Sequence, residues 1–376
     1  MSMIPTELRE SVPAVDDVRY MNTGASGPTP RSVLEAGQAE LESHEWESAG
    51  DDGPYPHAFN LYDTVRDSIA SFIQTTSEEI ALTQSTSDGI NRIATAIEWE
   101  PGDVIVRTDL EHPAGVLPWE RLKQKGCEVR VVPTENGRIH RDDFTDAIQG
   151  AKLVCLSAIT WNYGTVLPVA ELSAEAADAG AFVLVDAVQW PGHLPLDVSS
   201  WDAHAVAMAS HKWMLGLWGA GFLYIDRAAL SRLEPAQIGY RSVAQMSSGG
   251  YELHSGAQQF EVGTTSTAPY VALDSAVTLL EDIGLPAIES HILSLAELLT
   301  DSIDAERIYS PRDPETGLVT IQVENPDTTI ERCKDEYNLV LRTLPEPSDA
   351  IRASIHAYNT REDVEILVEA LDRIAK

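Results

Sequence analysis

The sequence predicts an α/β fold, with a mostly parallel, doubly wound sheet in a large domain followed by a small C-terminal α+β domain. Between about residues 78 and 210, short β-branched or apolar runs alternate with longer helical patterns, which indicates parallel β-α-β construction. After residue 284, two helical patterns flank two short strand patterns. The chain has 376 residues, which is enough for one large domain and a smaller one.

Six apolar runs are predicted to be strands of the large sheet. They cover residues 79–83, 103–107, 128–133, 153–159, 182–186 and 203–209. Helices are predicted between them, among others over 88–99 and 169–180, and the second of these ends on a glycine suited to a helix C-terminus.

A helical pattern over 269–284 is expected to lead from the large domain into the final segment. We therefore expect a large domain over 15–284 and a small domain over 285–376, with residues 1–14 packing near the small domain. The stretch SSGGYELHSG (247–256) predicts a mobile loop, because serine and glycine favour turns.

The charge of the chain excludes several classes of partner. Acidic residues number 59 and basic residues 26, so the formal net charge of −33 would repel nucleic-acid phosphates and anionic lipids. The acids are spread along the chain, as on the solvated surfaces of halophilic proteins. The longest apolar stretch (205–225) contains His211 and Lys212, which argues against a membrane span, and the N-terminus lacks an apolar signal core. A cytoplasmic protein is expected.

The three cysteines, Cys127, Cys155 and Cys333, form no CxxC pair. This spacing supports neither a disulfide framework nor a zinc site, so no metal is predicted.

Polar residues follow three of the predicted strands, at the sheet edge where doubly wound folds bind ligands. Asp186 ends FVLVD and is followed by Gln189, Lys212 follows the strand over 203–209, and STSDG (85–89) opens a helix. Each has an ordinary structural explanation: a helix cap, a lysine whose ammonium reaches water, and an N-cap. Each also suits chemistry, since apolar surroundings make a lysine amine a better nucleophile and a helix N-terminus suits a phosphate.

One ligand matches all three strand ends. A phosphate needs the helix N-terminus, an aldehyde needs the amine, and a protonated pyridine nitrogen needs a carboxylate. Pyridoxal 5'-phosphate presents all three groups, so it is the predicted cofactor.

These motifs resemble the class V aminotransferases, a family that includes cysteine desulfurases, selenocysteine lyases and isopenicillin N epimerase-like proteins. The resemblance covers nearly the whole chain and implies the aspartate-aminotransferase-like fold, fold type I of pyridoxal-phosphate enzymes. It is carried by YMNTGASGPTP (20–30), QSTSDGIN (84–91), DAVQ (186–189), SHKWMLG (210–216), FEVGT (260–264) and IRASIHAYNTREDVEIL (351–367).

The resemblance implies a role for each matching residue. Lys212 is expected to hold the cofactor as a Schiff base, Asp186 to face the pyridine nitrogen, Gln189 to donate to the phenolic oxygen and His112 to stack on the ring. The positions matching phosphate ligands are Thr86, Ser87, Ser210 and His211.

Three further positions match functional residues of the family. Thr264 matches a residue that reaches the phosphate of the partner subunit, which implies a homodimer with active sites at the subunit interface. Arg352 matches the arginine that binds the carboxylate of an amino-acid substrate, and Asn162 matches a cofactor-binding position in an ambiguous register.

One departure from the family pattern bears on the reaction. Cysteine desulfurases carry a nucleophilic cysteine shortly before the carboxylate-binding arginine, but LRTLPEPSDA (341–350) has none, and Cys333 lies in a helical pattern. We therefore expect an external aldimine and removal of the Cα proton by Lys212, with transamination as the leading reaction. A C–S or C–Se lyase comes next, and an amino-acid epimerase third.

Two readings from other classes stay open. A nucleotide-binding dehydrogenase would need GxGxxG after an early strand, but the glycine-rich run GLWGAG (216–221) follows the lysine. A non-catalytic relative of the same fold would not need Lys212, Asp186 and Arg352 together.

Overall fold

The structure is a computed structural model that describes residues 5–50 and 53–374. Its large domain contains a seven-stranded sheet in which all strands are parallel except β10, which runs antiparallel to both neighbours. In sheet order the strands are β2 (Ile80–Thr83), β10 (Gly221–Ile225), β9 (Ala205–Ala209), β8 (Phe182–Asp186), β7 (Ala151–Ser157), β3 (Val104–Thr108) and β4 (Glu128–Val132). The predicted fold class, a mostly parallel doubly wound sheet, is confirmed.

Both faces of this sheet are covered by helices, as expected for strands that are apolar on both sides. Along β8, for example, Phe182 and Leu184 belong to one hydrophobic cluster and Val183 and Val185 to the other, because successive side chains point to opposite faces. The first cluster packs beneath α4 (Thr86–Ala96) and α5 (Leu117–Leu122). The second packs beneath α3 (Pro54–Phe72), α6 (Arg141–Ala147), α7 (Val169–Asp178) and α8 (Ala268–Ile283), and α2 (Arg31–Glu42) lies against α8.

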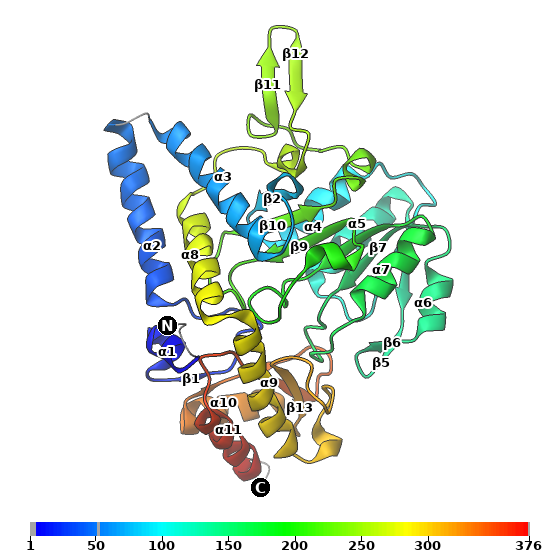
Figure 1. Ribbon diagram of the computed structural model, residues 1–376. Coiled ribbons are helices and arrows are strands. Elements are labelled where there is room, and N and C mark those ends of the chain that lie inside the picture. Colours follow the sequence, from blue (N-terminus) through cyan, green and yellow to red (C-terminus); the bar gives the residue numbers. More distant parts are fainter. Residues whose placement is uncertain (1–4, 51–52, 375–376) are drawn as a thin grey trace.

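The C-terminal part forms a smaller body, at the bottom of Figure 1. Its antiparallel sheet has the order β13-β16-β15 and packs with three helices around a separate core. The elements are α9 (Leu285–Asp301), β13 (Leu318–Gln322), α10 (Pro326–Tyr337), β14 (Leu339–Val340), β15 (Arg342–Thr343), β16 (Ala350–Ser354) and α11 (Arg361–Ile374).

The N-terminal segment contacts this smaller body. β1 (Arg19–Tyr20) pairs in parallel with β14. Arg9, in α1 (Pro5–Glu10), donates to Tyr358 O and pairs with Asp363 at 3.0 Å. The boundaries proposed for the two domains stay a prediction.

The expected loop over 247–256 is wrong in part. β11 (Val243–Ser247) and β12 (Gly250–Leu253) form a hairpin that projects from the large domain at the top of Figure 1. Only Ser248 and Gly249 form its turn. The apolar side chains that give a strand its usual pattern are exposed here, with Met246 80% and Tyr251 56% accessible, so no buried alternation marked these strands.

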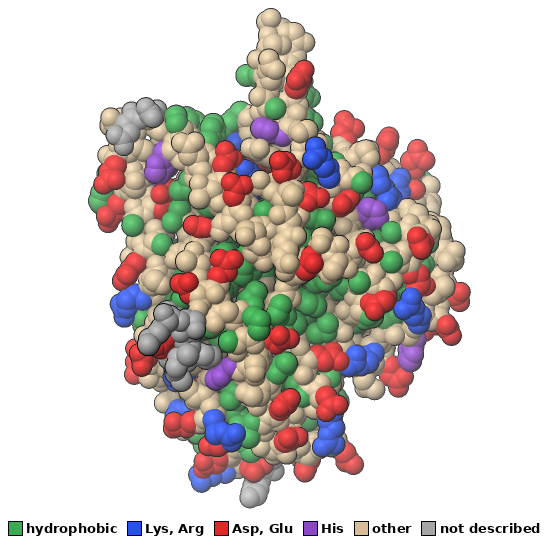
Figure 2. Space-filling view, in the orientation of Figure 1, with side chains coloured by type: hydrophobic (Ala, Val, Ile, Leu, Met, Phe, Trp, Pro, Cys, Tyr) green, Lys and Arg blue, Asp and Glu red, His purple; other side chains and the backbone are tan. Residues whose placement is uncertain are grey.

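Acidic side chains are scattered over the whole visible face and basic ones are fewer (Figure 2), consistent with the net charge of −33. Within the described part of the chain, no helix is both long and apolar enough to cross a bilayer.

Candidate active site

A cavity of about 210 Å³ lies beyond the C-terminal ends of the central strands. β8 ends at Asp186, β9 leads to Lys212, and β2 leads into α4, so the order of the strands places their terminal residues around one hollow. The lining residues are Gly24, Ala25, Ser85, Thr86, Ser87, His112, Ala114, Trp161, Asp186, Val188, Gln189, His211, Lys212 and Arg342. Seven predicted site residues are thereby brought together.

The backbone around Lys212 is tightly held. Gly27 N donates to His211 O at 2.8 Å, and a Cβ on Gly27 would lie 2.2 Å from Lys212 O, so only glycine fits there. Leu215 N donates back to Lys212 O at 3.1 Å, and Leu215 takes a left-handed φ of 58°. This strained turn fixes where the lysine side chain enters the cavity.

Burial lowers the pKa of Lys212 to about 7, although the negative charge of Asp186 opposes the shift. A substantial fraction of neutral amine is therefore present near neutral pH, as a nucleophile or base requires.

Asp186 is buried at the end of β8, and its Oδ1 accepts from Val188 N at 3.0 Å. Burial raises the pKa of this carboxyl, while Lys212 acts to lower it. A cationic ring nitrogen beside Asp186 would favour its ionised form.

A second buried carboxyl, Glu111, lies near Asp186, and, besides burial, the negative charge of Asp186 contributes to raising the pKa of Glu111. It accepts from Thr108 Oγ1 at 2.7 Å and from Ser157 Oγ at 2.6 Å, yet burial raises its pKa to about 7.

The N-terminus of α4 forms one wall of the cavity. Ser85 caps the helix by accepting from Asp88 N at 3.1 Å. Thr86 Oγ1 is buried and has no hydrogen-bond partner among the residues that the structure describes. A buried hydroxyl without a partner, beside helix N–H groups that also lack intrahelical partners, suits a phosphate group.

His112 lies edge-on to Trp161, with ring centroids 5.4 Å apart and an interplanar angle of 87°. Its Nδ1 accepts from Ala114 N at 3.2 Å, so in the neutral ring Nε2 carries the proton. Burial, followed by the charge of Lys212, lowers the His112 pKa to about 4. The ring is therefore neutral at physiological pH.

Two guanidinium groups at or directly behind the cavity wall, those of Arg342 and Arg352, have no carboxylate partner among the described residues. Arg352, in the middle of β16, is fully buried; its Nη1 donates to Trp161 O at 2.5 Å, and its Nε and Nη2 have no partner. Burial lowers its pKa to about 9, and the charge of Arg342 acts in the same direction. Arg342 lines the cavity and lies 5.6 Å from the Trp161 ring centroid.

Arg352 lies just behind the cavity wall, because a Cβ on Gly24 would come within 3.0 Å of its Nη2. Glycine at position 24 leaves the guanidinium close to the hollow. A buried cation with two unsatisfied nitrogen atoms is expected to bind an anion, since it is otherwise costly.

Three other predicted residues do not line the cavity. The Ser210 hydroxyl donates to Leu217 O at 2.7 Å. Asn162 Nδ2 contacts Glu346 O at 3.4 Å, and Thr264 is exposed on the surface. Their proposed roles stay predictions.

Sequence reasoning missed Arg342, Trp161 and Glu111. Arg342 stands in the stretch over 341–350 that lacks the family's cysteine, and its lack of an acidic partner among the described residues emerges only from the fold. Glu111 directly precedes His112, which was a usable signal because a carboxylate between an apolar strand and a functional histidine is seldom buried without a role.

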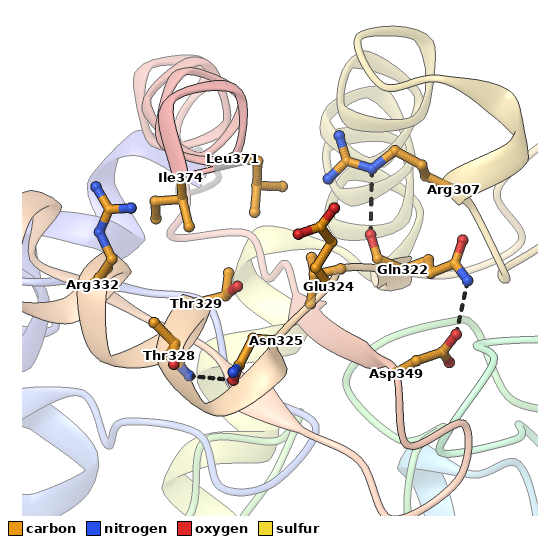
Figure 3. Close-up of a pocket in the computed structure, with 11 residues that line it drawn as sticks. Arg307, Gln322, Glu324, Asn325, Thr328, Thr329, Arg332, Asp349, Leu371 and Ile374 are labelled. Atoms are coloured by element: carbon orange, nitrogen blue, oxygen red, sulfur yellow. Dashed lines mark hydrogen bonds between the residues drawn. The ribbon is translucent and has the colours of Figure 1, made fainter. Parts of the chain in front are cut away.

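Another cavity, of about 570 Å³, lies in the C-terminal body between β13, α10 and α11. Arg307 and Arg332 lie on opposite sides of it, with Leu371 and Ile374 between them in the view of Figure 3. Arg332 is paired with Glu336 at 2.7 Å, and the hollow contains no lysine, cysteine or histidine. It therefore lacks the groups that the predicted chemistry needs.

The cavity around Lys212 fits pyridoxal phosphate by its chemistry. It offers an amine of lowered pKa, a buried carboxyl and an unpartnered hydroxyl at a helix N-terminus, the three features that the aldehyde, the ring nitrogen and the phosphate require. In residues 5–50 and 53–374, no cluster of histidine, cysteine and carboxylate side chains could hold a metal ion.

The family model described as "Aminotransferase class-V" matches residues 19–367. The chain belongs to the class V aminotransferase family. This class V protein is 32% identical to a probable cysteine desulfurase of Methanothermobacter thermautotrophicus, over 98% of each chain. The predicted membership is confirmed.

Solved structures of the family share the fold over nearly its whole length. The apo cysteine desulfurase of Thermococcus onnurineus NA1 matches with a TM-score of 0.91 and 28% identity, over 100% of this chain and 99% of the other. The cystine C–S lyase C-DES, in complex with its reaction product cysteine persulfide, matches with a TM-score of 0.89 and 27% identity over 96% and 98%.

Transamination as the leading reaction is wrong. The similar proteins are cysteine desulfurases and a cystine C–S lyase, so the comparisons support cleavage of a carbon–sulfur bond. The absence of a cysteine from residues 341–350 does not argue against cleavage of a carbon–sulfur bond. A lyase whose sulfur leaves with the product needs no protein thiol there.

Proposed function

We propose that this class V protein is a pyridoxal-phosphate-dependent C–S lyase that cleaves the Cβ–S bond of cystine by β-elimination. The observation that carries the proposal is a cavity lined by an amine, a carboxyl and the Arg342 guanidinium but no thiol, with the unpartnered Arg352 guanidinium just behind its wall. The likeness to the cystine C–S lyase supports it.

When bound, the cofactor supplies an electron sink for charge that develops at the substrate Cα. Lys212 Nζ would hold its aldehyde carbon, and Asp186 would hold the proton on its ring nitrogen. Thr86 and the N-terminal N–H groups of α4 would hold its phosphate, and His112 would cover its ring.

Lys212 is also the base. Because burial lowers its pKa to about 7, a substantial fraction of the amine is neutral near pH 7, and Nζ can accept the Cα proton of the substrate once it is released. Arg352 would fix the carboxylate on that Cα through its two unpartnered nitrogen atoms, which orients the C–H bond toward the amine.

Arg342 favours cystine over cysteine. Cysteine has one carboxylate, which Arg352 would bind, whereas cystine has a second carboxylate on its departing half. The Arg342 guanidinium lines the same cavity and has no acidic partner among the described residues, in a chain with more than twice as many acids as bases. Arg342 would bind that second carboxylate.

The cysteines support elimination without a protein persulfide. All three are buried, none lines the cavity, and burial raises the pKa of each thiol. The sulfur would leave on the substrate fragment: cystine and water would give pyruvate, ammonia and cysteine persulfide, with the Cβ–S bond electrons going to the persulfide.

A product analysis tests this function. Holoenzyme incubated with cystine should release pyruvate and ammonia in equal amounts, with cysteine persulfide trapped by an alkylating reagent. Lys212→Ala should release none. Alanine as the product from cysteine would instead indicate desulfuration, and no product from either amino acid would favour a non-catalytic relative.

We also propose that the active unit is a homodimer, to which the projecting hairpin and Thr264 contribute. Three exposed rings, Tyr55, Phe59 and Tyr240, contact one another with centroids 6.0 to 6.2 Å apart. Gly263, beside Thr264, lies against Tyr240. An exposed aromatic cluster of this kind is typical of a subunit contact.

A further inference from the structure

We propose that Trp213 is a positioning residue: its indole N–H fixes the orientation of the Gln189 carboxamide, so that an amide N–H, and never the oxygen, is presented to the cofactor. This inference rests on the proposed cofactor site. It assigns a task to a residue that has no atom in the cavity lining.

The Gln189 carboxamide lies between two groups of fixed polarity. Trp213 Nε1 donates to Gln189 Oε1 at 2.6 Å, and Gln189 Nε2 donates to Gly24 O at 3.0 Å. An indole N–H can only donate and a carbonyl oxygen can only accept, so the positions of the amide oxygen and nitrogen are determined by chemistry.

A flipped carboxamide would be costly. Rotation by 180° would place the Gln189 nitrogen against the Trp213 N–H and its oxygen against Gly24 O, which gives two mismatched pairs. Both side chains are buried, with Gln189 2% and Trp213 0% exposed, so water could not compensate. The second N–H of Gln189 Nε2 is left without a protein acceptor in the described chain, in a residue that lines the cavity.

Trp213 is itself held on both sides. Its ring stacks on His193 with centroids 3.5 Å apart and an interplanar angle of 10°. His193 Nε2 accepts from Gly317 N at 2.8 Å, and His356 Nε2 donates to Trp213 O at 2.9 Å. Gly317 and His356 come from the C-terminal body. The orientation of a residue beside Lys212 therefore depends on contacts from both parts of the chain.

Loss of the Trp213 N–H should be visible in the cofactor itself. A donor at the phenolic oxygen withdraws negative charge and so lowers the proton affinity of the neighbouring imine nitrogen. In Trp213→Phe, the midpoint of the pH titration of the visible absorbance band should move to higher pH. The shift should correspond to a proton affinity about 3- to 10-fold higher than in wild type. Gln189→Glu, which keeps the acceptor and removes the donor, should shift it further in the same direction.

Two comparisons separate orientation from packing. Trp213 replaced by 3-benzothienylalanine keeps the bicyclic shape without the N–H and should shift the midpoint like phenylalanine, at nearly wild-type Tm. Trp201→Phe, at a buried tryptophan packed on Trp190, should leave the midpoint unchanged.

The double variant Trp213→Phe/Gln189→Glu should shift the midpoint no more than Gln189→Glu alone, because orientation has no effect once the amide is gone. A wild-type midpoint in both Trp213 variants, or fully additive shifts, would overturn the proposal. Wild-type protein that shows no visible band with pyridoxal phosphate would instead refute the cofactor site on which it rests.

Discussion

Arg352 is a fully buried cation for which the described residues provide one backbone carbonyl and no carboxylate. Such a group destabilises the fold unless an anion completes it. Arg307 is also partly buried and has no acidic partner in the part of the chain that the structure describes, but it lies in the distant cavity of the C-terminal body and donates to Gln322 O at 3.3 Å. Substitution of Arg307 is therefore a matched control for substitution of Arg352, which lies at the proposed site.

Arg352→Gln should weaken the binding of amino acids by about 2–5 kcal/mol, because it removes a buried charge-assisted pair. The measurement is a titration of the cofactor absorbance with cystine. Arg307→Gln should leave the affinity unchanged. Equal affinities for wild type and Arg352→Gln would remove Arg352 from the site.

Arg342→Gln should discriminate between substrates. Because cysteine has only one carboxylate, kcat/KM for cystine should fall by about 10- to 100-fold, corresponding to about 1.5–3 kcal/mol for a hydrogen bond to a charged group, while that for cysteine changes little. A parallel loss for both substrates would contradict binding of a second carboxylate.

The pKa of Lys212 predicts a pH dependence of stability. The folded pKa is about 7 and the ordinary value is 10.5, so between them the unfolded chain binds a proton that the folded protein lacks. The lysine therefore adds a slope of about 1.4 kcal/mol per pH unit, with stability of the apoprotein rising as pH rises from about 7 to about 10.

Lys212→Met removes this contribution. The free energy of unfolding of the Lys212→Met apoprotein should exceed that of wild type, and this difference should be largest at or below pH 7 and should shrink toward pH 10. Urea unfolding of both apoproteins at pH 7, 8 and 9 measures it. A constant difference across the three pH values would show that the amine is not desolvated in the folded state.

At the scale of the element, α4 joins the sheet to the phosphate-binding end of the cavity. Thr86→Val removes the unpartnered hydroxyl at almost constant volume and should weaken cofactor binding by about 10-fold, or about 1.4 kcal/mol. Thr95→Val, on an exposed turn of the same helix, is the control for helix stability. Equilibrium dialysis measures both dissociation constants, and equal weakening by the two substitutions would assign the effect to the helix.

The sequence anticipated the central elements because parallel strands buried on both faces are continuous apolar runs, and the polar residues that end them are easy to locate. The antiparallel direction of β10 was not predicted, because direction depends on pairing partners. The Trp213–Gln189 contact joins residues that follow two different strands. Arg352 and Arg342 are notable because the described elements around them provide no carboxylate, which only the fold reveals. Neither has a local signature.

At the scale of the whole molecule, the net charge of −33 makes the folded state sensitive to salt. Repulsion among exposed acids opposes compaction, and the Debye length falls from about 10 Å at 0.1 M to about 3 Å at 1 M. The Tm should therefore rise between 0.1 and 1 M KCl. A variant with the exposed acids Glu35, Glu42 and Glu98 replaced by glutamine should rise less, and an unchanged or falling Tm in wild type would contradict this account.

Association of two subunits through the exposed aromatic cluster would link the molecular surface to the active site. Wild-type protein should elute with a mass near 82 kDa by light scattering, twice the chain mass of 41.0 kDa. Phe59→Asp, within the exposed aromatic cluster, should give monomers, whereas Leu117→Asp, at an apolar residue that is 65% exposed on α5, should not.

If Thr264 completes the phosphate site of the partner, the Phe59→Asp monomer should bind pyridoxal phosphate several-fold more weakly than the dimer. Thr264→Val should weaken binding to a similar extent while remaining dimeric. A monomer with undiminished cofactor affinity would show that each chain holds the phosphate alone, because the contribution of the neighbouring subunit is the only difference between the two states.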